Sequence, residues 1–197
     1  MTRITQFSIL VIGCLANFFC LQRYFKKMKY GQLIKEILFA VYLYGFLYFT
    51  FFSREAGSEA IMTLQLFKSY RFAITFDFGF SHVIKQIFTE GLSAGLASIH
   101  IVAKKTFEGI ILNILLFIPL GYMLPCIFRK LGKALWKVIL IGFLCSLITE
   151  TVQLVTHLGW FDLDDLFNNT IGCAVGAVLY VMFLRERKRE SEGEVGI

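Results

Sequence analysis

The sequence predicts an all-α protein, a polytopic membrane helix bundle with about five transmembrane helices. Its 197 residues are 57% hydrophobic and 17% charged, which is more apolar and less charged than a typical soluble domain. The charged residues divide the chain into long apolar runs, and a helix needs roughly 20 such residues to cross a bilayer core of about 30 Å. Because the runs are continuously apolar and do not alternate, helices are favoured over the strands of a barrel. We therefore expect a multi-pass protein of the cell membrane.

Cutting the chain at its charges places the spans. The expected helices are residues 4–21, 37–53, 109–128, most of 138–161, and 166–184. Residues 4–21 lack an A-x-A cleavage site, which favours a retained helix over a signal peptide. Residues 54–108 are the one large loop, in which 91–103 is uncharged but too short to span and is expected to be interfacial or re-entrant.

Basic residues predict the orientation. Lys and Arg cluster at three places, with five residues in 23–35, four in 129–137 and four in 185–189. With five spans the three clusters share one side, which the positive-inside rule assigns to the cytoplasm. The N-terminus is then outside and the C-terminus cytoplasmic. The chain divides into a first helix with a basic cytoplasmic loop (1–36), a membrane domain (37–184) and a charged cytoplasmic tail (185–197). The net charge of +6 is thus a topology signal, and we expect membrane lipids and no nucleic acid as partners.

Polar residues at one expected depth form the candidate site. Asn113, Glu150, Gln153, Asp165 and Asn169 all fall near the outer ends of the last three helices, and Asp162 precedes the last one. We predict that these six residues bind a ligand. Acidic side chains inside membranes are costly and usually face a protein interior or a wet cavity.

Several of these residues have a structural alternative. Glu150 and Gln153 share one helix face, and His157 joins them if the helix continues; His157 is otherwise an interfacial residue. Asn113 is also suited to a hydrogen bond between helices. One of Asp162, Asp164 and Asp165 is expected to cap the last helix, where a carboxylate meets free amides.

Three motifs carry a resemblance to a known family. They are NILLFIPLG at residues 113–121, E-x-x-Q at 150–153 and FDLDDLFNNTIG at 161–172. In this order they resemble the VanZ family, named for a glycopeptide-resistance accessory protein, over about residues 35–184. Family members often carry an Asn-Leu-x-Pro-Phe-like segment in the outer loop, where this sequence has Arg71-Phe72 without the proline. Many members also have an Arg just before the Asp-rich motif, where this sequence has Gly159-Trp160. The structural positions of the motifs and of the following helix are Phe117, Pro119, Gly121, Gly172 and Gly176; the last two form a G-x-x-x-G pattern that allows close helix contact.

The resemblance implies a bacterial cell-envelope protein, associated in some members with reduced susceptibility to teicoplanin-like glycopeptides. It implies no known reaction, and we expect a non-enzymatic protein that binds a lipid-linked cell-wall precursor or a glycopeptide at the outer-leaflet site. One alternative is an intramembrane enzyme in which Glu150 with Asp162 or Asp165 supplies paired carboxylates. Another is a small transporter or assembly factor. None of the five Cys has C-x-x-C spacing, and we expect no cofactor and no metal site.

The predicted orientation is testable with topology reporters. A reporter that is active only outside the cell should be inactive at residue 197 and active within residues 156–165, because with five spans the three dense basic clusters share the cytoplasmic side. An active reporter at residue 197 would contradict the five-helix topology.

Overall fold

Helices make up almost all of the structure, a computed structural model that describes residues 13, 28–52, 61–75, 80–93 and 101–193. Within these residues four helices are long and apolar enough to cross a membrane. The four are Gly31–Phe52, Lys105–Ile127, Leu135–Val155 and Leu163–Arg185. The prediction of an all-α membrane protein is therefore confirmed. The first predicted span, residues 4–21, lies outside the described residues apart from Gly13, so the count of five stays a prediction.

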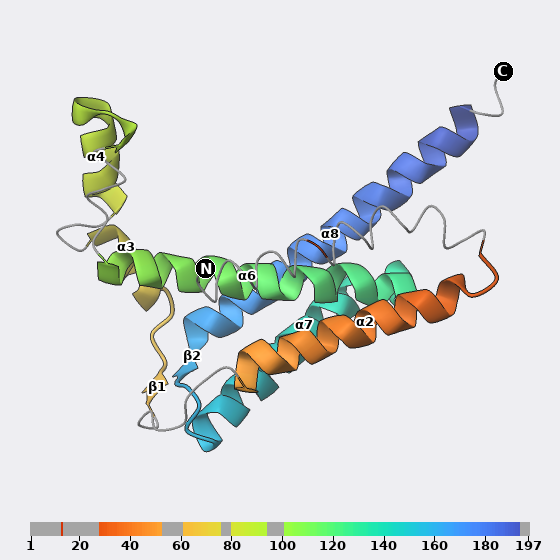
Figure 1. The fold of residues 1–197 in the computed structure, drawn as a ribbon, viewed down its shortest axis with the longest axis horizontal. Helices are drawn as coiled ribbons and strands as arrows, with labels where there is room; N and C mark the ends of the chain where they lie inside the picture. The colour runs from red at the N-terminus through yellow and green to blue at the C-terminus, as the bar shows by residue number, and fades with distance from the viewer. Residues whose placement is uncertain (1–12, 14–27, 53–60, 76–79, 94–100, 194–197) are drawn as a thin grey trace.

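The elements follow one another as the ribbon in Figure 1 shows. In chain order they are α2 (Gly31–Leu47), the π-helical segment η1 (Tyr48–Phe52), β1 (Met62–Thr63), α3 (Lys68–Thr75), α4 (Phe80–Glu90), α6 (Ile101–Ile127), the 3-10 turn η2 (Leu131–Lys133), α7 (Leu135–Val155), β2 (Phe161–Asp162) and α8 (Leu163–Gly193).

Spans that follow one another along the chain alternate in direction, so the bundle has two distinct ends. α6 and α8 run the same way, because Gly172 of α8 packs on Ile114 of α6 and Gly176 packs on Ile118. α2 and α7 run the opposite way (Figure 1). We call the end where α2 and α7 finish and α6 and α8 begin the polar end. We call the other end, which carries the α6–α7 turn with its basic residues 129–137, the basic end.

The helix boundaries differ from the expected ones where charges were used to cut the chain. α6 begins at Ile101, so the last residues of segment 91–103 belong to this helix and are not part of a separate interfacial piece. α8 begins at Leu163 and continues to Gly193 through the charged tail. A helix keeps its hydrogen bonds when it leaves the apolar core, so charged side chains at its ends do not terminate it.

Close packing of α6 on α8 forms the centre of the bundle. A Cβ atom added at Gly172 would lie 2.1 Å from the Ile114 carbonyl oxygen, and one added at Gly176 would lie 2.1 Å from that of Ile118. On α6, a Cβ at Gly121 would lie 2.0 Å from the carbonyl oxygen of Cys173. Only glycine allows two helix backbones to approach this closely. The close helix contact expected from the G-x-x-x-G pattern is therefore confirmed.

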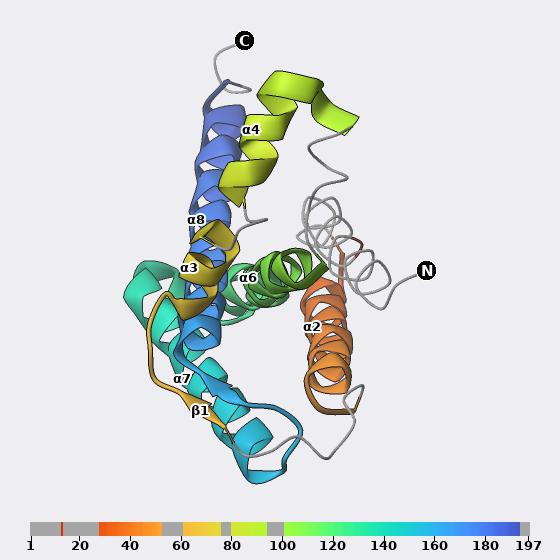
Figure 2. The ribbon, with the colours of Figure 1, turned by 90° about the vertical axis from the view of Figure 1, so that its left-hand side faces the viewer.

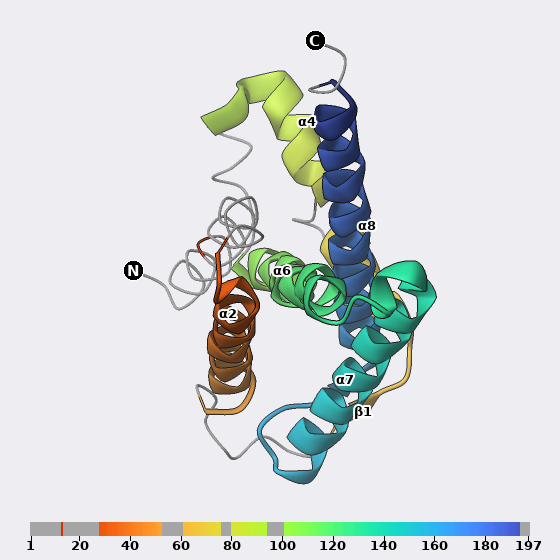
Figure 3. The same cartoon turned by 90° about the vertical axis from the view of Figure 1, so that its right-hand side faces the viewer.

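The other two spans lie on opposite sides of this central pair. Seen along α6, α2 lies to one side and α7 and α8 lie to the other (Figure 2), and the view from the opposite end agrees (Figure 3). α2 is joined to α6 by the Tyr42 hydroxyl, which donates to the Leu116 carbonyl at 2.7 Å. The ring of Phe46 also meets that of Phe117 edge-on. Phe117 and Pro119, two of the predicted motif positions, are buried in this core.

The close approach of α6 and α8 predicts different outcomes for two glycine substitutions. Gly172→Ala places a methyl group against backbone and should lower the free energy of unfolding by about 1–3 kcal/mol. Gly109→Ala is the matched control, since nothing lies within 4 Å of a Cβ there and alanine favours a helix. Thermal unfolding in detergent measures both. Equal stability of Gly172→Ala and the wild type would contradict the observed packing.

Candidate functional site

A pair of short strands brings the outer loop to the start of α8. β1 and β2 are parallel, with Met62 opposite Phe161 and Thr63 opposite Asp162. The Phe161 amide also donates to the Ile61 carbonyl at 3.0 Å. Backbone groups that are buried in the protein need partners, because water cannot reach them. The strand pair supplies these partners and fixes the loop at the polar end.

Asp164 connects α8 to the first turn of α3. Its side chain is fully buried, and its carboxylate accepts hydrogen bonds from the amides of Phe67 and Ser69, the latter at 2.7 Å. These amides stand at the N-terminal end of α3, where helix amides lack intrahelical partners and the helix dipole favours an anion. Phe67 takes up a left-handed backbone conformation with a φ of 64° just before the helix. Asp164 therefore caps α3 from a distant part of the chain.

Asp162 caps α8 itself. Its Oδ1 accepts from the amide of Asp164, in the first turn of α8, at 2.9 Å. One of the three aspartates was expected to cap this helix, and Asp162 does so. Its own amide donates to Glu150 Oε2 at 3.2 Å. The three carboxylates of Glu150, Asp162 and Asp164 thus each hold a backbone amide of a following or distant segment.

One face of α7 holds the neighbouring segments in place. Glu150 and Gln153 are both 2% exposed, and the Gln153 side-chain amide donates at 3.2 Å to the carbonyl of Thr50, in the η1 segment that follows α2. The expectation that Glu150 and Gln153 share a face is met. His157 does not join them, because the helix ends at Val155. His157 is exposed and left-handed, with a φ of 55°, in a C-cap where the Leu158 amide donates to the Gln153 carbonyl.

Two consecutive asparagines face different neighbours of α8. Asn169 donates from Nδ2 to Ser146 Oγ of α7 at 2.8 Å, and Asn168 accepts at Oδ1 from the Tyr70 hydroxyl of α3. Both are buried, and each leaves one polar atom, Asn168 Nδ2 and Asn169 Oδ1, without a partner among the described residues. Turning either amide over exchanges its two atoms and still leaves one unpaired.

A third buried polar atom lies at the end of α2. The Thr50 hydroxyl is buried and has no partner in the described part of the chain. Thr50 lies in η1, and π-helical turns occur frequently at functional sites. An unpaired buried polar atom costs about 1–3 kcal/mol. Thr50, Asn168 and Asn169 are therefore neutral groups at the polar end that each have an atom whose hydrogen-bonding capacity the described protein does not use.

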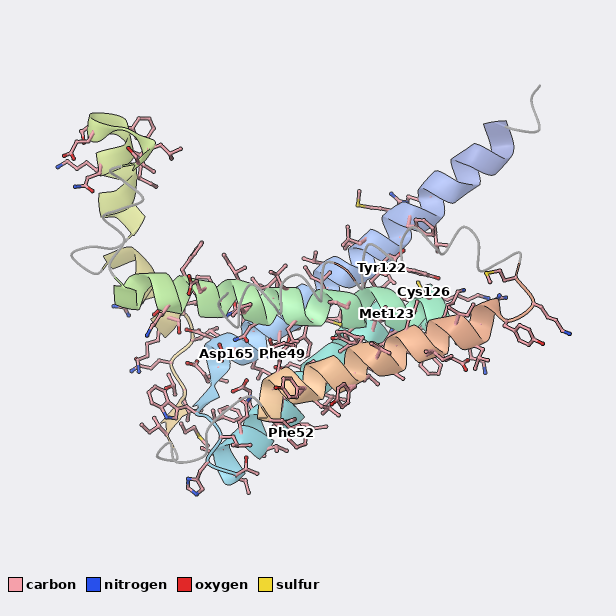
Figure 4. All side chains as sticks on the ribbon, viewed as in Figure 1. Phe49, Phe52, Tyr122, Met123, Cys126 and Asp165 are labelled. Atoms are coloured by element: carbon pink, nitrogen blue, oxygen red, sulfur yellow. The ribbon has the colours of Figure 1, made fainter. Side chains whose placement is uncertain are left out.

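The remaining predicted site residues lie at the same end. Asn113 is half-buried on α6, next to Ile114, whose carbonyl packs on Gly172. Asp165 is half-buried in the first turn of α8. Figure 4 labels it toward the polar end together with Phe49 and Phe52 of η1. Hydrogen bonds connect Glu150 with Asp162, whereas Gln153 and Asn169 reach Thr50 and Ser146. The ligand-binding role of the six residues stays a prediction.

Burial and nearby negative charge raise the pKa values of two groups at the polar end, Asp162 and Tyr70. Burial raises the pKa of Asp162, and the charge of Asp164 adds to this, while the amide of Asp164 and the charge of Lys68 act in the opposite direction. Burial also raises the pKa of the Tyr70 hydroxyl, helped by Asp164 and Asp165. Tyr70 therefore stays protonated and remains a donor for Asn168. Among the described residues no group of three His, Cys, Asp or Glu side chains is placed to hold a metal ion.

Sequence reasoning did not single out four members of this arrangement: Thr50, Tyr70, Ser146 and Asn168. Ser146 has a signal in the sequence, since it stands one turn before Glu150 on the same helix face. Asn168 adjoins Asn169, but its burial depends on α3. Thr50 and Tyr70 have no local signal, because their position relative to α7 and α8 is a product of the tertiary fold.

Four apolar spans with a buried polar cluster at one end define a polytopic helical membrane protein with a candidate site near the membrane surface. The sequence model of the VanZ/LLP1 family matches residues 39–184. The chain therefore belongs to the VanZ/LLP1 family, and the resemblance seen in its motifs is confirmed. It is 33% identical over 81 residues to Protein VanZ of Enterococcus faecium, which covers 40% of this chain and 47% of that protein. The chain thus matches about half of this relative's length, and no solved structure matches the chain.

The cap that Asp164 provides can be tested by hydrogen exchange. Asp164→Asn replaces one acceptor oxygen with an amide group that cannot accept from Phe67 or Ser69. We expect α3 to lose about 1–2 kcal/mol of local stability, and its first amides to exchange about 5–30 times faster. Asp162→Asn is the control, because its side-chain oxygen still accepts from the Asp164 amide. Unchanged exchange in Asp164→Asn would show that the cap does not stabilise α3.

Proposed function

We propose that this protein binds a lipid-linked cell-wall component at its polar end and thereby affects susceptibility to teicoplanin-type glycopeptides. The observation that carries this proposal is the set of three unpaired buried atoms, Thr50 Oγ1, Asn168 Nδ2 and Asn169 Oδ1. They include donors and an acceptor, and all belong to neutral groups. Hydroxyl and amide groups of a sugar or peptide are suited to such partners.

The apolar surface beside the polar end supports a ligand with a lipid chain. Phe52, Val155 and Trp160 are large, exposed side chains at the ends of η1 and α7 and just before β2. Tryptophan is enriched at membrane–water interfaces, where its ring sits at the headgroup level. A lipid-linked molecule would place its chain against such a surface and its polar part near the buried amides.

The distribution of basic residues supports an outer position for this site. The basic cluster in 129–137 follows α6, the cluster in 185–189 lies in the last part of α8, and both helices start at the polar end. By the positive-inside rule the basic end then faces the cytoplasm. The polar end would lie at the outer leaflet, where lipid-linked cell-wall components are exposed to glycopeptides.

The hydrogen bonds of the carboxylates favour binding over acid–base catalysis. Glu150, Asp162 and Asp164 each accept from a backbone amide, so they act in the scaffold of the site. A general acid or base needs a proton that it can exchange with a substrate within hydrogen-bonding distance. We therefore rank a binding function above an intramembrane enzyme.

Thr50→Val tests the proposal because it removes the unpaired hydroxyl and keeps the shape of the side chain. If the hydroxyl only incurs a burial cost, the variant should be as stable as the wild type or more stable, with full function. If it binds the ligand, stability should hold while affinity for a lipid-linked disaccharide-peptide precursor falls about fivefold, the equivalent of about 1 kcal/mol. The measurements are precursor binding to protein in lipid nanodiscs and glycopeptide susceptibility at equal membrane levels.

Thr151→Val is the matched control. Thr151 lies on an exposed part of α7, and its hydroxyl donates to the Leu147 carbonyl at 2.7 Å. Glu150→Gln is the companion variant, since Gln can still accept from the Asp162 amide but carries no charge. Unaltered precursor binding in both Thr50→Val and Glu150→Gln would refute the site.

A further inference from the structure

α4 lies across the direction of the central span. It follows α3 and packs against it, and α3 in turn packs against α6 at the polar end (Figure 1). In Figure 2 the view runs down the axis of α6, whereas α4 is seen from the side. Since α6 crosses the membrane, a helix that runs across its axis at its end runs along the membrane surface.

The sequence of α4 gives it one apolar face. Ile84, Ile87 and Phe88 follow one another at helical spacing of three and four residues, and they share one side of the helix. The polar residues Lys85, Gln86 and Thr89 occupy the rest of the helix circumference, with Gln86 opposite the stripe and Lys85 and Thr89 beside it. An apolar stripe opposite a polar one, in a helix that does not span, is the pattern of helices that lie in a membrane interface.

Most of this apolar face is exposed, although Ile87 is half-buried. Phe88 is 86% exposed and Ile84 is 40% exposed, and Leu92 just beyond the helix is 64% exposed. The first half of α6 also presents exposed apolar side chains, Phe107 and Ile111, at the same end of the bundle. Exposed apolar side chains therefore occur on both α4 and the first half of α6.

We propose that α4 is an interfacial helix whose Ile84–Phe88 face lies in the leaflet at the polar end, with Lys85 and Thr89 toward water. The inference requires only that the four spans cross a membrane, and it is independent of the ligand at the polar end. It gives α4 a mechanical role. α4 fixes the depth of α3, and α3 provides the amides that Asp164 holds and the hydroxyl that Asn168 accepts from.

Lipid quenching of tryptophan fluorescence tests the proposal. Trp136→Phe and Trp160→Phe give a background without tryptophan. In that background Phe88→Trp places a reporter on the apolar face, and Thr89→Trp places a matched reporter on the polar face one residue later. In vesicles of brominated phosphatidylcholine, we expect Phe88→Trp to be quenched several-fold more than Thr89→Trp.

Equal quenching of the two reporters, or none at Phe88→Trp, would overturn the proposal. Ile84→Trp provides a second reporter on the same face and should behave as Phe88→Trp does. If a second copy of the protein covers this face, Phe88→Trp should escape quenching at high protein-to-lipid ratio and become quenched on dilution into excess lipid. That outcome would replace the lipid with a dimer contact and would also overturn the proposal.

Discussion

The backbone contact between α6 and α8 is the constraint on which the arrangement of the polar end depends. Because Gly172 and Gly176 carry no side chain, the carbonyls of Ile114 and Ile118 lie directly against α8. This contact fixes both the depth and the rotation of α8. At that depth and rotation Asn169 meets Ser146 of α7, and Asp164 meets the first turn of α3.

From this fixed helix, carboxylates connect the surrounding segments in sequence. Glu150 of α7 holds the amide of Asp162, the Asp162 side chain holds the amide of Asp164, and Asp164 holds the start of α3. Amides that are buried at strand and helix ends have few water partners, so each bond left unmade would carry the cost of an unsatisfied polar group. The acidic residues that first suggested chemistry therefore serve the backbone.

Composition and charge predicted the class of fold because each helix that crosses a bilayer must be a continuous apolar run of about 20 residues, which can be recognised in the sequence alone. The glycine contacts and the shared face of Glu150 and Gln153 were also predictable, since helical spacing alone decides them. The start of α6 at Ile101 was not, because a helix continues past its charged residues when it leaves the apolar core. The role of Asp164 depends on a partner 95 residues earlier in the chain. No local pattern places Ser69 or Tyr70 beside α8, so that half of the site required the tertiary structure.

The acidic and the neutral polar side chains at the polar end make different kinds of hydrogen bond, and this difference bears on the proposed ligand. The carboxyl groups of Glu150, Asp162 and Asp164 accept from backbone amides, whereas the unpaired atoms of Thr50, Asn168 and Asn169 belong to neutral side chains. Buried neutral donors and acceptors discriminate strongly against any ligand that leaves them unsatisfied. They act without attracting every ion of the opposite charge. In the proposed binding function, selectivity at this end would follow from matching hydrogen bonds, and the acidic side chains hold the backbone segments that carry those neutral groups.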